Sequence, residues 1–465
     1  MRYTILIIGL LLSGCAPAIR QGAQPIEKIP PITTNSNPGV KPSAEIPEMW
    51  WKEFKDSSLD RLVDLAMKSN PALEEAKDRL RAAQAAIDTT EGILYPHVDS
   101  VGSLRRQRLS RNGNNTIYNG KTATIANVFP LFVNYNLDLW NRNGEIISAV
   151  SSSEKGGEAR YRQSALMLSS SVIKTYFALN TARNLVETQA EIVKLTAEKA
   201  DLLTAAYTAG IRPKTPSISV HADLSESKAA LATLENRRKS LNFALLELLG
   251  KPPGERVDPA STNIPERFGL PERIDLDLVS KRPDVQAALW NVKRASSLEK
   301  VARDAFYPNI NLFALAGFNS IGISDLLGPG GATYAYGPAV DLPIFEGGAL
   351  TGRLHEKEAA FDEAVHAYNR ILLAAVRQIA DALSAMQYGK ERLDERNASL
   401  ELRRLEAGIA CSGFRAGVSG KLPLLEAEIR MDREKMAIME DRLNWLNSIT
   451  DAATALGGGF GRWPS

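Results

Sequence analysis

An internal duplication limits the fold of this 465-residue chain more than any other feature of its sequence. In the first copy a helical stretch opens at Pro71 and closes at Pro96, 25 residues later. In the second copy the same 25 residues separate Pro283 from Pro308, and in both copies a tyrosine precedes the closing proline. Because a repeat this long sets the architecture of the whole chain, we expect two similar halves of one fold.

The duplication continues into the last part of each half. The sequence YTAG at residues 207–210 is matched by FRAG at 414–417, and both lie in runs that end in Leu-Gly about 40 residues later. The predicted segments are a first repeat (50–249), a proline-rich linker or equatorial region (250–271) and a second repeat (272–457).

Each repeat contains a very long run without proline. Residues 145–209 and 349–416 are rich in Ala, Leu, Glu, Lys and Arg, and as helices each would extend about 95–100 Å. Helices of this length need neighbours along their sides, as in a coiled coil. Each run ends in a glycine-containing turn, near 210–216 and near 417–423, and a shorter antiparallel helix is predicted to return from each of these two tips.

Between the helices, the apolar period changes from 3.6 to 2, which predicts strands. One β-hairpin is expected at about 97–140 and a second at about 309–343, with Leu139 and Leu342 still inside their alternating runs. The segment 97–107 alternates poorly. Strands of about ten residues cross a bilayer when tilted. Four strands cannot close a barrel alone, and open edges in lipid cost several kcal/mol per unpaired group, so such a chain has to associate.

The N-terminus indicates export and lipidation. Residues 1–14 have the short apolar run of a signal peptide, and Leu-Ser-Gly before Cys15 looks like a bacterial lipobox, which implies acylation of Cys15. The alternative is an incidental cysteine after a signal peptide. Residues 15–49 are rich in proline and predict an extended, lipid-anchored tether, and residues 458–465 form a tail. The other cysteine, Cys411, is predicted to be a buried or free thiol.

Charge and motifs give little support for nucleic-acid binding or catalysis. With 56 basic and 54 acidic residues the net charge is only +2, which makes no electrostatic case for nucleic acid. His355-Glu356 lacks the second histidine of a zinc-protease helix, and no nucleotide-binding loop is complete. We therefore expect no enzyme, no metal and no cofactor.

In its order of motifs, the sequence resembles the TolC-like outer membrane factors, and most closely their lipoprotein branch, the OprM and NodT-type efflux proteins. The matching residues are Trp50-Trp51 with Phe54, Asp56 and Leu59; Asn70-Pro71 with Leu73; Leu139 with Gly144; Leu278 with Lys281, Arg282, Pro283, Asp284 and Val285; Phe306-Tyr307-Pro308; and Leu342-Pro343-Ile344-Phe345 with Gly347-Gly348.

The resemblance implies a mixed α+β, mainly α fold in which four transmembrane β-strands per protomer contribute to a 12-stranded trimeric β-barrel. It also implies a long α-helical coiled-coil barrel that extends into the periplasm of a Gram-negative bacterium. The homotrimer would dock onto a periplasmic adaptor and an inner-membrane pump of the resistance-nodulation-division type. The chain would then be the passive exit duct of a tripartite multidrug efflux system, anchored in the outer membrane at Cys15.

By the same resemblance, the hairpin tips close the periplasmic end and open when the partners dock. The candidate tip or gate residues are Gly210, Arg212, Lys214, Arg415, Gly417 and Lys421. Related proteins often carry aspartates there, and this chain has none, so we expect an entrance that is less cation-selective. Glu426 lies where the family has an aspartate, and it is a candidate for an adaptor contact or a tip salt bridge; a solvated helix face is the alternative.

The main alternative function is a periplasmic coiled-coil adaptor or scaffold lipoprotein, which would interact without forming a pore. An adaptor normally has one helical hairpin, whereas two are predicted here. An enzyme is the third alternative. The sequence leaves open which substrate is exported, which pump and adaptor take part, and what Cys411 does.

Overall fold

The computed structural model describes residues 20, 22–34, 37–43, 46–47, 49–112, 117, 119–255, 257 and 267–458. The predicted signal peptide, Cys15 and almost all of the predicted tail lie outside these residues. The chain divides into two compact units, and each unit takes residues from both repeats. Unit 1 comprises Met1–Pro25, Leu80–Gly157 and Ala287–Tyr368, and unit 2 comprises Ile26–Arg79, Glu158–Gln286 and Asn369–Ser465.

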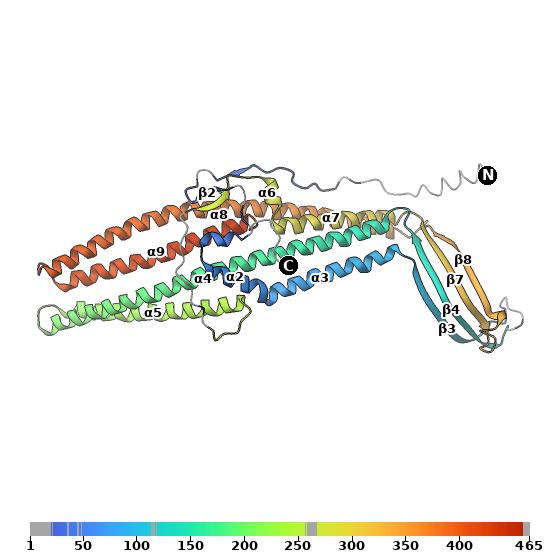
Figure 1. Cartoon of the computed structure of the whole chain (residues 1–465), viewed down its shortest axis with the longest axis horizontal. Coiled ribbons are helices and arrows are strands. Elements are labelled where there is room, and N and C mark those ends of the chain that lie inside the picture. The colour runs from blue at the N-terminus through green and yellow to red at the C-terminus, as the bar shows by residue number, and fades with distance from the viewer. Residues whose placement is uncertain are drawn as a thin grey trace. The chain divides into compact units, whose positions relative to one another are not determined.

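Unit 1 contains an antiparallel four-stranded sheet in the order β3-β4-β7-β8 (Figure 1). The strands are β3 (His97–Arg108), β4 (Thr122–Leu137), β7 (Asn309–Ile321) and β8 (Ala332–Asp341). The register pairs Ile125 with Ile321 and Leu137 with Ile310, so the hairpins of the two repeats are joined into one sheet through β4 and β7. The alternation of residues predicted each hairpin but not this joint.

Two strand ends differ from the sequence-based prediction. Asp138 and Leu139 lie beyond β4, because the Asp138 carboxylate accepts hydrogen bonds from the backbone N–H groups of Asn143 (3.0 Å) and Gly144 (3.3 Å) and so opens the next helix. Leu342 lies beyond β8, where the following Pro343 has no N–H for a strand ladder. β4 is also longer than the expected ten residues, at 16.

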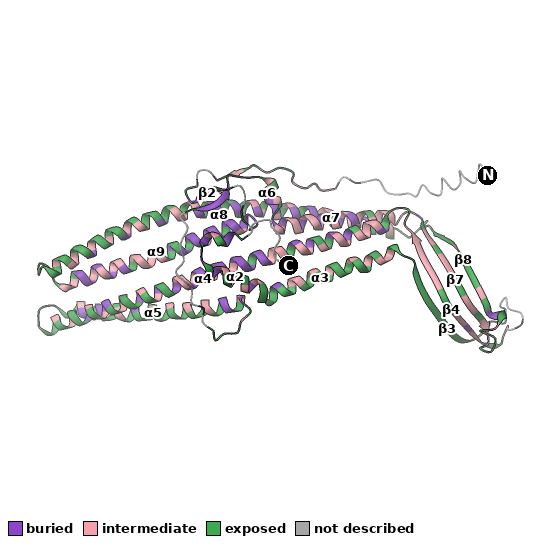
Figure 2. Cartoon of the chain, viewed as in Figure 1, coloured by how far each residue is buried: buried purple, intermediate pink, exposed green. Residues whose placement is uncertain are grey.

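The sheet has almost no core of its own. No residue of β3, β7 or β8 is buried, and in β4 only Ala123 and Ala126 are buried (Figure 2). Large apolar side chains on the strands are instead exposed, among them Val98, Val101, Leu104, Leu131, Leu312, Tyr334, Tyr336 and Val340. Both faces of the sheet therefore lack a cover within the part of the chain that the structure describes.

Two pairs of long helices follow the strands. α4 (Arg142–Thr208) and α8 (Ala349–Arg415) each have 67 residues, or about 100 Å. The returning helices α5 (Lys214–Leu248) and α9 (Lys421–Ala455) each have 35 residues. The two repeats thus keep the same helix lengths. None of the described helices is apolar enough over 18 residues to cross a membrane.

Shorter helices precede each hairpin. They are α2 (Ser57–Ser69), α3 (Pro71–Glu91) and η2 (Gly92–Leu94) in the first repeat, and α6 (Leu276–Ser280) and α7 (Pro283–Asp304) in the second. The short helix η3 (Pro329–Gly331) lies within the second hairpin, between β7 and β8. Asn70 separates α2 from α3, as expected for the residue that precedes Pro71. Its side-chain oxygen accepts from the N–H groups of Ala72 (3.0 Å) and Leu73 (3.1 Å) and caps α3.

The core of unit 2 is aromatic. η1 (Trp50–Phe54) places Trp50 and Phe54, both buried, against Phe268, and Phe54 against Phe177 of α4 at a ring distance of 4.9 Å. Next to them the Tyr176 hydroxyl donates to Asp56 (2.7 Å), the N-cap of α2. This cluster fixes the start of the first repeat on α4.

Two small sheets bind part of the predicted tether to the end of the linker and to the start of the second repeat. β1 (Ile32–Thr33) pairs with β6 (Arg273–Ile274), and β2 (Val40–Ser43) pairs with β5 (Phe268–Pro271). The Asn37 amide also donates to the Leu383 carbonyl of α8 (2.8 Å). The described residues between 32 and 43 are therefore held by specific backbone pairing, although their composition is that of an extended linker.

Candidate functional site: the tips of the helical hairpins

The first tip joins α4 to α5 through a glycine C-cap. Gly210 has a left-handed φ of +72°, and the Ile211 N–H donates to the Ala206 carbonyl (2.9 Å). The space around Gly210 is open, so glycine is needed there for its backbone angle. This geometry turns the chain sharply and satisfies the last carbonyls of α4.

The second tip repeats the first at the level of single hydrogen bonds. Gly417 has a φ of +71°, and the Val418 N–H donates to the Gly413 carbonyl (2.9 Å). Its surroundings are open as well. The duplication seen in the sequence therefore includes the turn chemistry of both tips.

The basic residues of the tips fall into two groups. Arg212, Lys214 and Arg415 are exposed, and none of them makes an ion pair with a residue that the structure describes. Lys421 instead pairs with Glu198 of α4. The sequence indicated four basic tip residues, and the structure neutralises one of them.

Glu426 belongs to a second ion pair between the same two helices. Its carboxylate lies 3.0 Å from the Lys199 ammonium group of α4. Neighbouring residues of α4, one acidic and one basic, thus reach opposite charges on α9. Both pairs connect the hairpin of the first repeat to the hairpin of the second.

Apolar side chains pack beside these ion pairs. Ile192 and Leu195 of α4 form a buried cluster with Leu425 and Ile429 of α9, and Met436 packs against it. A second cluster, nearer the tips, consists of Ala200, Leu203 and Val220, with Leu224 and Leu422 packed against it. α9 therefore lies along α4 by apolar contact flanked by charge pairs.

Each hairpin is also held together internally. In the first, the Thr204 hydroxyl lies 3.0 Å from the Ser217 hydroxyl and 3.2 Å from His221 Nε2. In the second, Arg430 of α9 bonds Glu406 of α8 at 2.7 Å. The order of contacts in unit 2 is thus α5, α4, α9, α8, and the hairpins meet at the α4–α9 contact.

An acidic groove lies in this α4–α9 contact. It has a volume of about 440 Å³ and is lined by Glu187 and Glu191 of α4 and Glu428 and Asp432 of α9. Burial raises the pKa of the Glu428 carboxyl, and the charges of Asp432, Glu198 and Glu191 raise it further. Asp432 is compensated by Lys435 (2.7 Å) and Glu191 by Lys194 (3.0 Å). Among the described residues no group of His, Cys, Asp and Glu is arranged to hold a metal ion.

Sequence analysis missed Glu198 and Lys199. They lie about ten residues before the C-terminal end of a long helix with many charged residues, and no local motif marks them. Only the packing of α4 against α9 gives them partners. Cys411, which the sequence left without a role, is a half-buried free thiol in α8.

The fold is shared with solved outer membrane channels. The chain superimposes on the Campylobacter jejuni CmeC outer membrane channel with a TM-score of 0.86 and 24% identity, over 96% of this chain and 95% of that one. The open state of the Neisseria gonorrhoeae MtrE outer membrane channel gives a TM-score of 0.81 and 23% identity, over 95% and 98%. The architecture is that of an outer membrane channel with paired helical hairpins.

Sequence relatives agree. The chain is 27% identical over 474 residues to the multidrug resistance outer membrane protein MdtQ of Escherichia coli O6:H1 (strain CFT073), covering 97% of both chains. It is 25% identical over 467 residues to MdtP of the same strain, covering 97% and 94%. The family model described as outer membrane efflux protein matches residues 62–251 and 277–458, one segment in each repeat, so the chain belongs to this family.

This membership confirms the resemblance seen in the motifs, and the chain is an outer membrane efflux channel. The alternative of a periplasmic adaptor gives way to it. Family and fold are those of channel proteins and not of enzymes.

Proposed function

We propose that the channel is a homotrimer in which three copies of the sheet close a 12-stranded transmembrane barrel. The observation that carries this proposal is the uncovered sheet, whose end strands β3 and β8 have free edges. In lipid an open edge is excluded by the cost of its unpaired backbone groups, and added copies of the same sheet remove it. Light scattering of the detergent-solubilised protein, with electron micrographs of the same peak, tests this; a stable monomer would overturn it.

The trimer would act as the passive exit duct of a tripartite multidrug efflux system. Acylation of Cys15 would anchor it, its helices would form a tunnel in the periplasm, and an adaptor and a resistance-nodulation-division pump would dock at the tips. Support comes from the family, from relatives named multidrug resistance proteins, and from the two matching tips. Co-purification with a co-expressed periplasmic adaptor and a pump of this type tests the assembly, and a Cys15→Ser variant tests the anchor.

In this channel the closed state would depend on the two α4–α9 ion pairs. Each is half-exposed and contributes about 0.2–1 kcal/mol. Lys199→Glu would replace the attraction to Glu426 by repulsion. It should destabilise the closed state by about 1 kcal/mol relative to the open state and raise the open fraction of the channel about 5-fold. Glu426, the candidate adaptor contact, would exchange this partner when an adaptor docks.

Single-channel recording in planar bilayers measures the open fraction. Lys199→Glu and Glu426→Lys should each open the channel more, and the double variant should return it to the wild-type level. Arg377→Glu is the matched control, because the ion-pair partner of Arg377 is Asp381 on the same helix, α8 (2.8 Å). Equal effects of Lys199→Glu and Arg377→Glu would refute the role of the pair between the hairpins.

The exposed cations Arg212, Lys214 and Arg415 would leave the entrance without an anionic ring. Reversal potentials under a KCl gradient should then show weak ion selectivity, since exposed charges are screened at physiological salt. Replacing the three by aspartate should shift the potential toward cation selectivity. Strong cation selectivity of the unmodified protein would contradict the proposal.

A further inference from the structure

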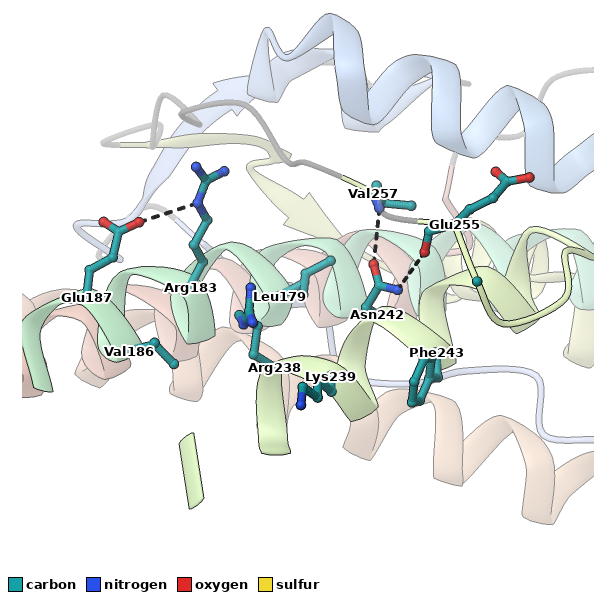
Figure 3. A pocket seen from close by; sticks show the side chains of 11 residues that line it. Leu179, Arg183, Val186, Glu187, Arg238, Lys239, Asn242, Phe243, Glu255 and Val257 are labelled. Atoms are coloured by element: carbon teal, nitrogen blue, oxygen red, sulfur yellow. Dashed lines mark hydrogen bonds and ion pairs between the residues drawn. The ribbon is translucent and has the colours of Figure 1, made fainter. Parts of the chain in front are cut away.

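A second cavity in unit 2, away from the tips, lies between α4, α5 and the segment that follows α5 (Figure 3). Its volume is about 570 Å³, within the 300–1,000 Å³ that small-molecule pockets usually have. One wall is fixed by Asn242, whose amide donates to the Glu255 carbonyl (3.1 Å) and accepts from the Val257 N–H (3.1 Å). The wall is therefore held by hydrogen bonds to α5.

The charges that line this cavity are not balanced. Its two carboxylates are occupied, Glu255 by Lys251 (2.6 Å) and Glu187 by Arg183 (3.5 Å). The other two cations, Arg238 and Lys239 of α5, make no ion pair with any described residue. Two adjacent positive charges are thus left uncompensated at one side of the cavity.

Arg238 has a further unusual feature. Its Nε atom is buried and meets no hydrogen-bond acceptor among the residues that the structure describes. Buried donors in proteins nearly always have a partner, and leaving one unpaired is costly. An acceptor that enters beside the guanidinium group would relieve this cost, and a planar anion matches its geometry.

The rest of the lining is apolar. Phe243 of α5 is 53% exposed although its ring is large, and Leu179 and Val186 of α4 border the same cavity. Figure 3 shows these side chains on the two helices that also carry the cations. The cavity therefore combines a cationic side with an aromatic and aliphatic side.

We propose that this cavity is a binding site for a small amphipathic anion, a carboxylate or sulfonate carried on an aromatic body. The anionic group would bind at Arg238 and Lys239, and the body would cover Phe243. The site is distinct from the tips, and its occupancy does not depend on the proposed export function.

The test is equilibrium binding of 2-naphthoate to the full-length protein in phosphatidylcholine nanodiscs, which contain no anionic lipid. Arg238→Gln should weaken binding about 10- to 100-fold, as expected for the loss of a charge-assisted hydrogen bond. Arg237→Gln is the matched control, because Arg237 precedes Arg238 on the same helix but does not line the cavity. Lys239→Gln gives a second reading if Arg238→Gln does not fold.

Two further results decide the proposal. Phe243→Ala should weaken binding of 2-naphthoate and leave binding of inorganic sulfate unchanged, and neutral 2-naphthalenemethanol should bind at least 10-fold more weakly than the anion. Absence of 2-naphthoate binding, or equal losses in Arg237→Gln and Arg238→Gln, would overturn the site.

Discussion

Replacing Arg282 by leucine should loosen one end of one helix by a predictable amount. Arg282 is only 5% exposed and lies at the start of α7. Its guanidinium donates to both carboxylate oxygens of Asp284 (3.1 and 2.8 Å), to the Gln378 side chain of α8 (2.8 Å) and to the Ala455 carbonyl at the end of α9 (2.6 Å). One side chain thus joins three helices and satisfies a terminal carbonyl that has no partner within its own helix.

The magnitude follows from these contacts. Removing one partner of a buried ion pair costs about 3–5 kcal/mol. Because the Asp284 side chain is 29% exposed and also accepts from the Val285 N–H (2.9 Å), it keeps part of its solvation. We therefore expect Arg282→Leu to lower the free energy of local opening at the end of α9 by the lower value, about 3 kcal/mol. This loss corresponds to roughly 100-fold faster amide exchange there.

Asn70 provides an internal comparison, since it occupies the same place before the proline in the first repeat. Its side chain donates to the Leu248 carbonyl at the end of α5 (2.9 Å) and caps α3. Asn70→Ala loses an N-cap and one hydrogen bond, each about 1 kcal/mol, so opening should accelerate by roughly 25-fold.

Amide hydrogen exchange of the full-length protein in detergent separates the two effects. Arg282→Leu should accelerate exchange in the last turn of α9 and leave the last turn of α5 unchanged, and Asn70→Ala should do the reverse. An Arg282→Leu protein that exchanges like the wild type in the last turn of α9, or that loosens both helix ends equally, would refute this reasoning.

Three further changes give measurable outcomes. Because the pKa of Glu428 is raised in the folded protein, its ionised form destabilises the α4–α9 contact, and the free energy of unfolding should rise as the pH falls through that pKa. Glu428→Gln should therefore raise the melting temperature at pH 7 but not at acidic pH. The control Glu440→Gln, at an exposed position, should leave the melting temperature unchanged at both pH values. Gly417→Ala should cost about 1–2 kcal/mol in thermal unfolding because its φ is +71°, and Gly417→Asn should cost less. Gly39→Val should lower the free energy of unfolding by about 1–3 kcal/mol, because a Cβ at Gly39 would lie 2.4 Å from the buried ring of Trp445. An unchanged melting temperature would contradict this close approach.

The sequence predicted the elements better than their contacts. The repeats at Pro71 and Pro283 marked helix starts, and the proline-free runs marked helices whose observed ends lie within a few residues of those expected. Both signals are local, since proline and glycine act on the backbone within one turn. The ends of β4 and β8 were misplaced because apolar alternation continues past the last ladder hydrogen bond.

The partners of the site residues could not be read from the sequence. Lys421 was recognised as a tip cation, yet its partner Glu198 is more than 200 residues away, and nothing local says that α9 packs on α4. The unbalanced cavity at Arg238 was missed for the same reason, since its cations are ordinary exposed-helix residues until α4 and the following segment enclose them. The domain limits drawn from the repeats remain a prediction.

The two tips share a backbone but not an electrostatic environment, and the difference indicates how the hairpins are used. Lys214 is the counterpart of Lys421 at the repeat offset of 207 residues, and the counterpart of its partner Glu198 is Leu405, which is 64% exposed. With Leu402 and Ile409, at 68% and 74% exposed, Leu405 forms an apolar row on one face of α8. Within one chain α9 meets α4 through two ion pairs beside buried apolar clusters, whereas this row of α8 has no partner among the described residues. In the proposed trimer the row would face the first hairpin of the next copy. The ion pairs would then be the part of the α4–α9 contact that exchanges partners, while the contact between protomers would be apolar.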